Sequence, residues 1–193
     1  MIRCEVEHNV LEFKRPAKTS RGQYTEHDSW LLKVTDEQGR QGAGEAAPLP
    51  DLSCDASLRY DDNIRAFARD LERNNGCIDY EKYQGCSSMF FAAESALRQL
   101  KGEKVSLSKP IQINGLIWMG DLETMKERVD EKLSAGFRCI KIKVGGLDFE
   151  KEIELIRYLR ENPKYPERGK SVELRLDANC AFKPEEAMVK LEK

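Results

Sequence analysis

The second half of the chain alternates between short apolar segments and longer amphipathic ones, and this alternation constrains the fold more than any other feature. Strand-like segments begin near Pro110, Arg138 and Val172, and a segment of helical periodicity follows each. One strand in roughly every 30 residues is typical of parallel βα units. The expected strands are residues 110–118, 138–144 and 172–178, and the expected helices are residues 122–134, 149–160 and 184–193.

Three βα units are too few to close a barrel. A (β/α) barrel of the TIM type takes about 250 residues, whereas this chain has 193 in total. A sheet of three parallel strands keeps an open edge. We therefore expect residues 101–193 to form an incomplete α/β barrel.

The first half has a different pattern. Residues 2–46 are strand-like, with a turn at residues 36–39, and helical spacing follows at residues 58–73 and 88–100. These segments predict a small antiparallel sheet with two helices. We expect an α+β domain over residues 1–100, ahead of the barrel-type part.

Two polar or glycine-rich segments of the first half are interpreted differently, the first as a loop of the kind that often touches ligands and the second as structural. Lys18–Asp28 is polar and contains Gly22, which predicts a mobile surface loop. Gly42 and Gly44 lie in a strand, without the strand-to-helix context of a dinucleotide-binding motif. We therefore expect them to serve the fold.

The charge balance excludes several partners. The chain has 32 basic and 34 acidic side chains and a net charge of -2, which favours neither nucleic acid nor an anionic membrane. It contains no apolar stretch of about 18 residues and no export signal at its start. Its six cysteines lack C-x-x-C spacing and indicate reduced thiols in the cytoplasm. A small-molecule ligand is the expected partner.

The strand at residues 138–144 carries two amines on one face. Because side chains alternate along a strand, Ile140, Ile142 and Val144 share one face while Lys141 and Lys143 share the other. In a βα barrel the apolar face packs against helices, so both amines would point to the barrel interior. Their proximity would lower the pKa of one lysine and make it a general base. An isolated Lys-x-Lys more often lies on a solvated edge strand.

The strand at residues 172–178 repeats this phase. Glu173, Arg175, Asp177 and Asn179 share a face, and the last two lie at the carboxyl end, where barrel enzymes place catalytic groups. Asp177 could supply an oxygen ligand to Mg²⁺, although a turn or helix cap would also explain Asp-Ala-Asn. Its coincidence with the lysine strand favours the metal interpretation.

Other signals are interpreted as structural. The two histidines are too few for a histidine metal site. Glu150–Glu154 is interpreted as the solvated face of a helix. Trp118 and Met119 are expected to be core or rim residues, and the strand before them is given no chemical role.

Segments along essentially the whole chain resemble the enolase superfamily, in its muconate-lactonising branch. They are Gly44–Pro50, Phe91–Leu97, Lys141–Gly145 and Leu176–Asn179. Within that branch, Asn114–Gly120 and Arg175–Asn179 are similar to segments of the o-succinylbenzoate synthases of menaquinone biosynthesis.

The resemblance implies a role for each residue of the polar face. Lys143 matches the base that removes the proton α to a carboxylate, and Lys141 matches its partner near the substrate carboxylate. Asp177 matches the first of three acidic Mg²⁺ ligands. Asn179 and Arg175 match positions that help to bind substrate.

The resemblance also implies an activity, and it implies that part of the active site lies outside this chain. We expect a carbon–oxygen lyase that removes the α proton of a small-molecule carboxylate with Mg²⁺ and then eliminates water, in menaquinone (vitamin K2) biosynthesis. Loops at residues 20–22 and 44–49 would close over the substrate. The other two metal ligands and an opposite lysine would lie beyond Lys193, so we expect this chain alone to be inactive.

Several alternatives stay open. The same branch contains N-acylamino-acid racemases, dipeptide epimerases and muconate cycloisomerases. A Schiff-base aldolase would use Lys141 or Lys143 as a nucleophile. A part-barrel without catalysis would pair with itself or with a missing C-terminal half.

Overall fold

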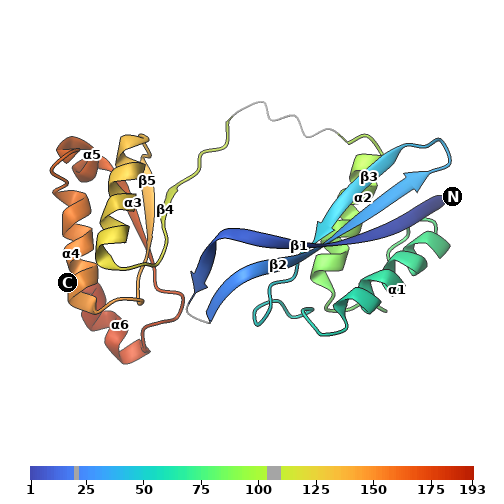
Figure 1. Cartoon of the computed structure of the whole chain (residues 1–193), viewed down its shortest axis with the longest axis horizontal. Coiled ribbons are helices and arrows are strands. Elements are labelled where there is room, and N and C mark those ends of the chain that lie inside the picture. Colours follow the sequence, from blue (N-terminus) through green and yellow to red (C-terminus); the bar gives the residue numbers. More distant parts are fainter. Residues whose placement is uncertain (20–21, 104–109) are drawn as a thin grey trace. The chain divides into compact units, whose positions relative to one another are not determined.

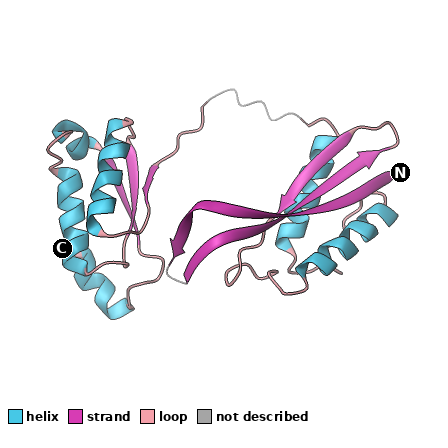
Figure 2. Ribbon diagram, in the orientation of Figure 1, coloured by secondary structure: helices cyan, strands magenta, loops and turns pink. Residues whose placement is uncertain are grey.

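The computed structural model describes residues 1–19, 22–103 and 110–193. Its helices and strands are shown in Figure 2. Contacts divide the chain into two compact units, Met1–Ala17 with Gln23–Ser108, and Lys109–Lys193 with Lys18–Gly22. Within the described part, the longest apolar helices fall short of what a membrane crossing requires.

The first unit is a three-stranded sheet with two helices (Figure 1). The strands β1 (Ile2–Thr19), β2 (Gly22–Asp36) and β3 (Gln41–Ala46) lie in the order β1-β2-β3, with β2 and β3 antiparallel. The helices are α1 (Tyr60–Arg73) and α2 (Ser87–Leu100). Asp36 closes the β2–β3 turn, because its Oδ1 accepts the backbone N–H groups of Gln38 and Arg40, both at 2.9 Å.

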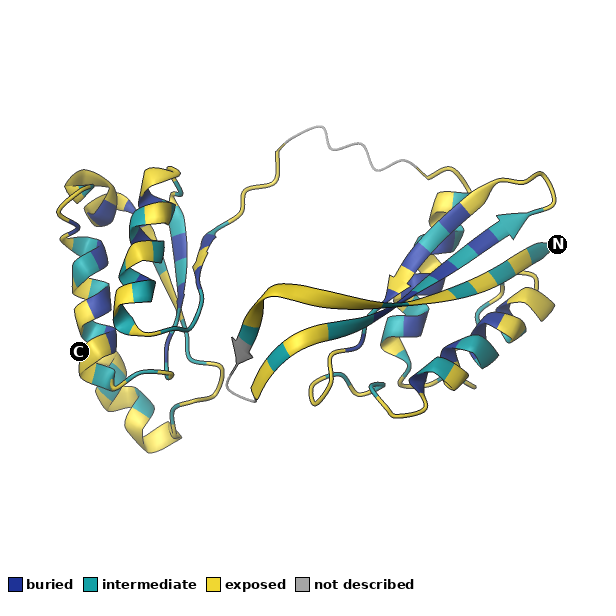
Figure 3. Ribbon diagram, viewed as in Figure 1, coloured by how far each residue is buried: buried dark blue, intermediate teal, exposed yellow. Residues whose placement is uncertain are grey.

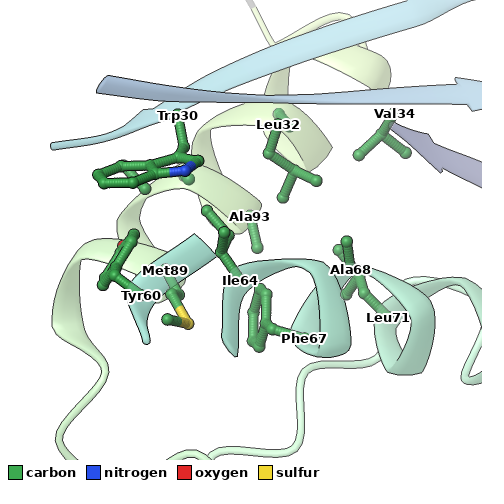
Figure 4. Packing of buried hydrophobic residues seen from close by; sticks show 13 residues of the cluster. Trp30, Leu32, Val34, Tyr60, Ile64, Phe67, Ala68, Leu71, Met89 and Ala93 are labelled. Atoms are coloured by element: carbon green, nitrogen blue, oxygen red, sulfur yellow. The ribbon is translucent and has the colours of Figure 1, made fainter. Parts of the chain in front are cut away.

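The core of this unit lies between β2 and the helices (Figure 4). Trp30, Leu32 and Val34 alternate along β2 and are at most 7% exposed. They face apolar side chains spaced three or four residues apart on α1, which is the spacing of one helical face. These residues of α1 are Ile64, Phe67, Ala68 and Leu71.

Strand β3 and helix α2 approach so closely that β3 has no room for a side chain at Gly42 or Gly44. A Cβ added to Gly42 would lie 1.9 Å from the carbonyl oxygen of Ala96, and one added to Gly44 would lie 1.9 Å from that of Ala92. Both alanines are fully buried. The prediction that these glycines serve the fold is confirmed.

The second unit is a parallel sheet in the order β4-β5-β6. Each strand is followed in the chain by a helix, as the βα pattern predicts. The strands are β4 (Gly115–Ile117), β5 (Cys139–Lys143) and β6 (Glu173–Asp177), and the helices are α3 (Leu122–Ser134), α4 (Phe149–Arg160), α5 (Pro166–Ser171) and α6 (Pro184–Leu191).

One face of this sheet is buried against α3 and α4 (Figure 3). Ile140 and Ile142 of β5 are 0% exposed and Val144 is 6% exposed. They share a core with Val129 and Leu133 of α3 and with Leu155 and Leu159 of α4. The predicted apolar face of β5 is therefore confirmed, and its lysines lie on the opposite face.

Several expectations about the first strands are corrected. Residues 22–28 belong to β2 rather than to a loop, because they continue the strand that pairs beside β1. Ser20 and Arg21, which belong to the predicted loop, lie outside the described residues. Strand β4 is shorter than residues 110–118, since Ile111 and Ile113 are 73% and 75% exposed and take no part in the sheet.

Three further differences concern later segments. Helix α5 was not expected, since it is a single short helix that begins at a proline and lacks an apolar period. The predicted phase of the strand places Leu176 opposite to Asp177, on the face expected to pack against helices, but it is 46% exposed because β6 is an edge strand. The domain division at residue 100 stays a prediction, because residues 104–109 lie outside the described part.

Replacing Gly44 with alanine should destabilise the first unit by about 3 kcal/mol, because the new methyl group collides with helix backbone that cannot move aside. Urea unfolding measures the change. Gly120→Ala is the control, since its Cβ would meet only side chains at 3.4 Å or more. Equal stability of the two variants would contradict the close approach of β3 and α2.

Candidate functional site

The carboxyl edge of the parallel sheet brings four of the five predicted site residues together. Lys141 and Lys143 project from β5 on the face opposite to the buried isoleucines. The strand register places Asp177 of β6 beside Lys143. Asn179 follows β6 in the turn before α6. The strand phase predicted from the sequence is therefore the phase of the structure.

A single carboxylate holds both amines. Oδ2 of Asp177 lies 2.6 Å from Nζ of Lys141 and 2.7 Å from Nζ of Lys143. Lys143 also donates to Oδ1 of Asn179 at 2.6 Å. Its side chain is 14% exposed, against 33% for Lys141, so Lys143 is the more shielded of the two.

The two ammonium groups hold the pKa of the Asp177 carboxyl far below its usual range. The largest cause is the hydrogen bond from Lys141, followed by that from Lys143. The backbone N–H of Asn179 adds to the effect by donating to Oδ1 of Asp177 at 3.0 Å. Asp177 therefore remains an oxygen anion over the whole physiological range, as a metal ligand must.

An unusual turn directs Asn179 back to Lys143. Asn179 and Cys180 both have left-handed backbone conformations, with φ of 46° and 61°. Asparagine tolerates this conformation better than most residues, whereas cysteine does not. The turn packs against the loop after β5, because a Cβ on Gly145 would lie 2.3 Å from Cβ of Ala181. The two loops therefore support each other beside the lysines.

Glu152 fixes the loop that follows Lys143. Its side chain is buried at 4% exposure, and its Oε1 accepts the backbone N–H groups of Gly145, Gly146 and Leu147. The sequence interpretation as a solvated helix face is wrong for this residue. The glycine pair after the lysine strand could have signalled a loop whose N–H groups need an acceptor.

Trp118 is a second residue of the site that the sequence analysis did not assign. Nζ of Lys143 lies over its indole ring, 5.8 Å from the ring centroid. The alternation of side chains along a strand could have placed Trp118 in the site. Leu116 lies opposite Lys141 in the register, so Trp118, two residues later, is on the same face and level with Lys143. Trp118 is therefore a rim residue, as expected, but on the rim of the amine site.

Arg175 is not drawn into this cluster. It forms an ion pair with Glu173 at 2.8 Å, and both side chains are more than half exposed. Its register partner is Lys141 rather than Lys143. The role of Arg175 in binding substrate stays a prediction.

The described residues provide only part of a cation site. Among them, no group of three or more histidine, cysteine or acidic side chains lies together. Asp177 offers carboxylate oxygens and Asn179 an amide oxygen, which are the ligands that Mg²⁺ prefers. Magnesium takes six ligands, so these residues fit one side of such a site and do not complete it.

Comparison with known proteins finds a matching family model and several relatives. Residues 124–193 match the family described as "Enolase C-terminal domain-like". The chain is 31% identical to o-succinylbenzoate synthase of Desulfotalea psychrophila over 222 residues, covering 95% of this chain and 59% of that protein. The chain is therefore similar to members of the enolase superfamily over nearly all of its length.

Other members of the superfamily are similar at lower identity. L-Ala-D/L-Glu epimerase of Bacillus subtilis is 25% identical and is covered over 56% of its length by the whole of this chain. The crystal structure of dipeptide epimerase from Cytophaga hutchinsonii, complexed with Mg and the dipeptide D-Ala-L-Val, is 25% identical with a TM-score of 0.78. It matches 99% of this chain and 55% of that one.

These matches confirm the predicted fold class, an α+β domain followed by an incomplete barrel of the enolase superfamily. The chain spans between 54% and 59% of the curated relatives that it matches. The matching relatives include both a synthase and epimerases.

The ionisation of Asp177 provides a test of the cluster. In a carbon-13 NMR titration, its carboxyl should stay ionised below pH 4, where ordinary aspartates with a pKa of about 3.9 take up protons. Lys141→Met or Lys143→Met should raise this pKa. An Asp177 that titrates like an exposed aspartate would contradict the cluster.

The same ionisation makes stability depend on pH. The pKa of Asp177 is lower in the folded state than in the unfolded state, so its contribution is fully present above the unfolded value. That contribution should begin to fall below about pH 4 and vanish below the folded pKa.

Glu152→Leu should lower the free energy of unfolding by about 3 kcal/mol, because it leaves the N–H groups of Gly145, Gly146 and Leu147 without their acceptor and removes a buried side chain that orders this loop. Glu152→Gln keeps an acceptor oxygen and should cost less. Glu150→Leu, at an exposed position of the same helix, is the control and should change stability by less than about 0.5 kcal/mol. Equal losses for Glu152→Leu and Glu150→Leu in urea unfolding would refute the role of Glu152.

Proposed function

We propose that this chain supplies the base and one metal ligand of an o-succinylbenzoate synthase-type lyase, a carbon–oxygen lyase of menaquinone biosynthesis. The observation that carries the proposal is the convergence of Lys141, Lys143 and Asp177 at the carboxyl edge of a parallel sheet. The identity to the Desulfotalea psychrophila enzyme supports this choice of reaction.

The chemistry of the chain's own residues centres on Lys143. As a neutral amine, its Nζ takes the proton from the carbon next to the substrate carboxylate. The ammonium so formed returns that proton to the departing hydroxyl group, which leaves as water. Lys141 lies 2.6 Å from the carboxylate of Asp177, beside Lys143, and its role in this proposal is to pair with the substrate carboxylate.

Magnesium is the cofactor that we propose, and Asp177 would be one of its ligands. A divalent cation stabilises the negative charge that develops on the substrate carboxylate when the proton is removed. The magnesium in the Cytophaga hutchinsonii epimerase structure supports this assignment. The further ligands would come from residues outside the described cluster.

A dipeptide epimerase is the second candidate. Three of the matching relatives are epimerases of dipeptides, at 25% or 26% identity. An epimerase would return a proton to the same carbon instead of eliminating water. Both reactions begin with the same step at Lys143, so the site geometry supports them equally.

The ligand and the location follow from the same proposal. The partner is a small-molecule carboxylate, as the superfamily relatives suggest. All six cysteines are free, which supports a reducing compartment such as the cytoplasm.

The decisive test is removal of the α proton. We suggest a hybrid enzyme in which this chain replaces the matching 59% of the Desulfotalea psychrophila synthase. Exchange of the α proton in D₂O, followed by NMR with Mg²⁺ present, should fall by about 10³-fold in Lys143→Ala. Lys170→Ala, at a lysine that is 68% exposed on α5, should leave exchange unchanged.

Three results would count against the proposal. A folded hybrid that exchanges no α proton would contradict it, and so would a Lys143→Ala variant with undiminished exchange. Borohydride trapping of substrate on Lys141 or Lys143 without any need for Mg²⁺ would favour the aldolase alternative. A panel of the synthase substrate and dipeptides then separates the lyase from the epimerase.

A further inference from the structure

Each strand of the parallel sheet contributes one side chain to a row at its carboxyl edge. Trp118 follows β4, Lys143 ends β5 and Asp177 ends β6. The row therefore presents an aromatic ring, an amine and a carboxylate, in that order. Asp177 lies on one side of the amine at 2.7 Å, and the indole ring lies on the other, with its centroid 5.8 Å from Nζ.

The backbone that carries Trp118 is held firmly. The guanidinium of Arg128 in α3 donates to the carbonyl oxygens of Trp118 and Met119, at 2.7 and 3.2 Å. Met119 packs against the loop after Lys143, since a Cβ on Gly146 would lie 3.3 Å from its Sδ. These contacts fix the backbone from which the half-buried indole ring of Trp118 projects. The position of Lys143 over the ring shows that the face of the indole is turned to the amine.

The position of the ring restricts what can reach Lys143. A carbon that gives its proton to Nζ must come within about 3–3.5 Å of that atom. With Asp177 on one side, such a carbon lies beside the indole face. A six-membered ring can lay one face against an indole, whereas the flexible backbone of a dipeptide touches it at fewer atoms.

We propose that Trp118 is a specificity-determining residue, which stacks on the ring of the substrate and favours ring carboxylates over dipeptides. The inference rests on the proposed α-proton removal and adds to it a residue that selects between substrates. The preferred substrate is a hydroxylated, non-aromatic ring carboxylate that becomes o-succinylbenzoate by loss of one water. The departing proton and hydroxyl group account for the whole change in composition.

A purely structural role for Trp118 would have a different consequence. If the ring only supported the ammonium of Lys143, its loss would slow proton removal from every substrate by the same factor. The ratio of kcat/KM for the ring substrate to kcat/KM for a dipeptide therefore separates the two roles.

The experiment compares Trp118→Phe and Trp118→Leu in the hybrid enzyme, with the synthase substrate and L-Ala-L-Glu. Loss of stacking should lower the ring-to-dipeptide ratio about tenfold in Trp118→Leu and by less than threefold in Trp118→Phe. Phe137→Leu is the matched control, because its ring faces Lys132 at the same 5.8 Å, just before β5 begins. It should leave the ratio unchanged.

A second measurement, product binding, tests the inference even if the hybrid enzyme does not turn over substrate. Binding of o-succinylbenzoate to the same proteins, followed by calorimetry, should weaken about tenfold in Trp118→Leu and remain within threefold in Trp118→Phe. An unchanged ratio, or unchanged product binding where no substrate turns over, would overturn the inference. Absence of α-proton exchange from every substrate, with product binding that still depends on Trp118, would refute the proposed function alone.

Discussion

Two ammonium groups on one face of a strand repel each other, and the carboxylate of Asp177 is what lets Lys141 and Lys143 share that face. One oxygen of Asp177 accepts from both amines, and the other is held by the backbone of Asn179. The carboxylate reaches them because β6 runs parallel to β5 with Asp177 opposite Lys143. The chemistry of the site therefore depends on a strand register, and the rest of the second unit serves to fix that register.

The register of β5 is fixed mainly by packing on the other face of the sheet. Full burial of Ile140 and Ile142 against α3 and α4 prevents β5 from shifting by one residue, which would exchange its isoleucines and lysines. Buried Glu152 then holds the loop after the lysines through three N–H groups. Packing sets the direction of the amines, and a buried carboxylate sets the loop that borders them.

The sequence predicts the parts of this arrangement that follow from local periodicity. Helices α3 and α4 begin and end at the expected residues, and the alternation in β5 places its lysines correctly. Contacts between distant segments could not be predicted from the sequence. A glutamate in a helix gives no sign that its side chain turns inward to accept a hydrogen bond from Gly145. The contact of Trp118 with Lys143 depends on the pairing of β4 with β5. Arg175 shares the phase of Asp177, yet its neighbour Glu173 engages it.

Hydrogen-bond scalar coupling in NMR tests the central claim most directly. With nitrogen-15 in the lysine side chains and carbon-13 in the Asp177 carboxyl, coupling across Nζ–H···Oδ2 should appear for both Lys141 and Lys143 in the folded chain. The ammonium hydrogens of both lysines should also exchange with water more slowly than those of Lys170, which is 68% exposed. Lysines that show no coupling to Asp177 and exchange as fast as Lys170 would contradict the account.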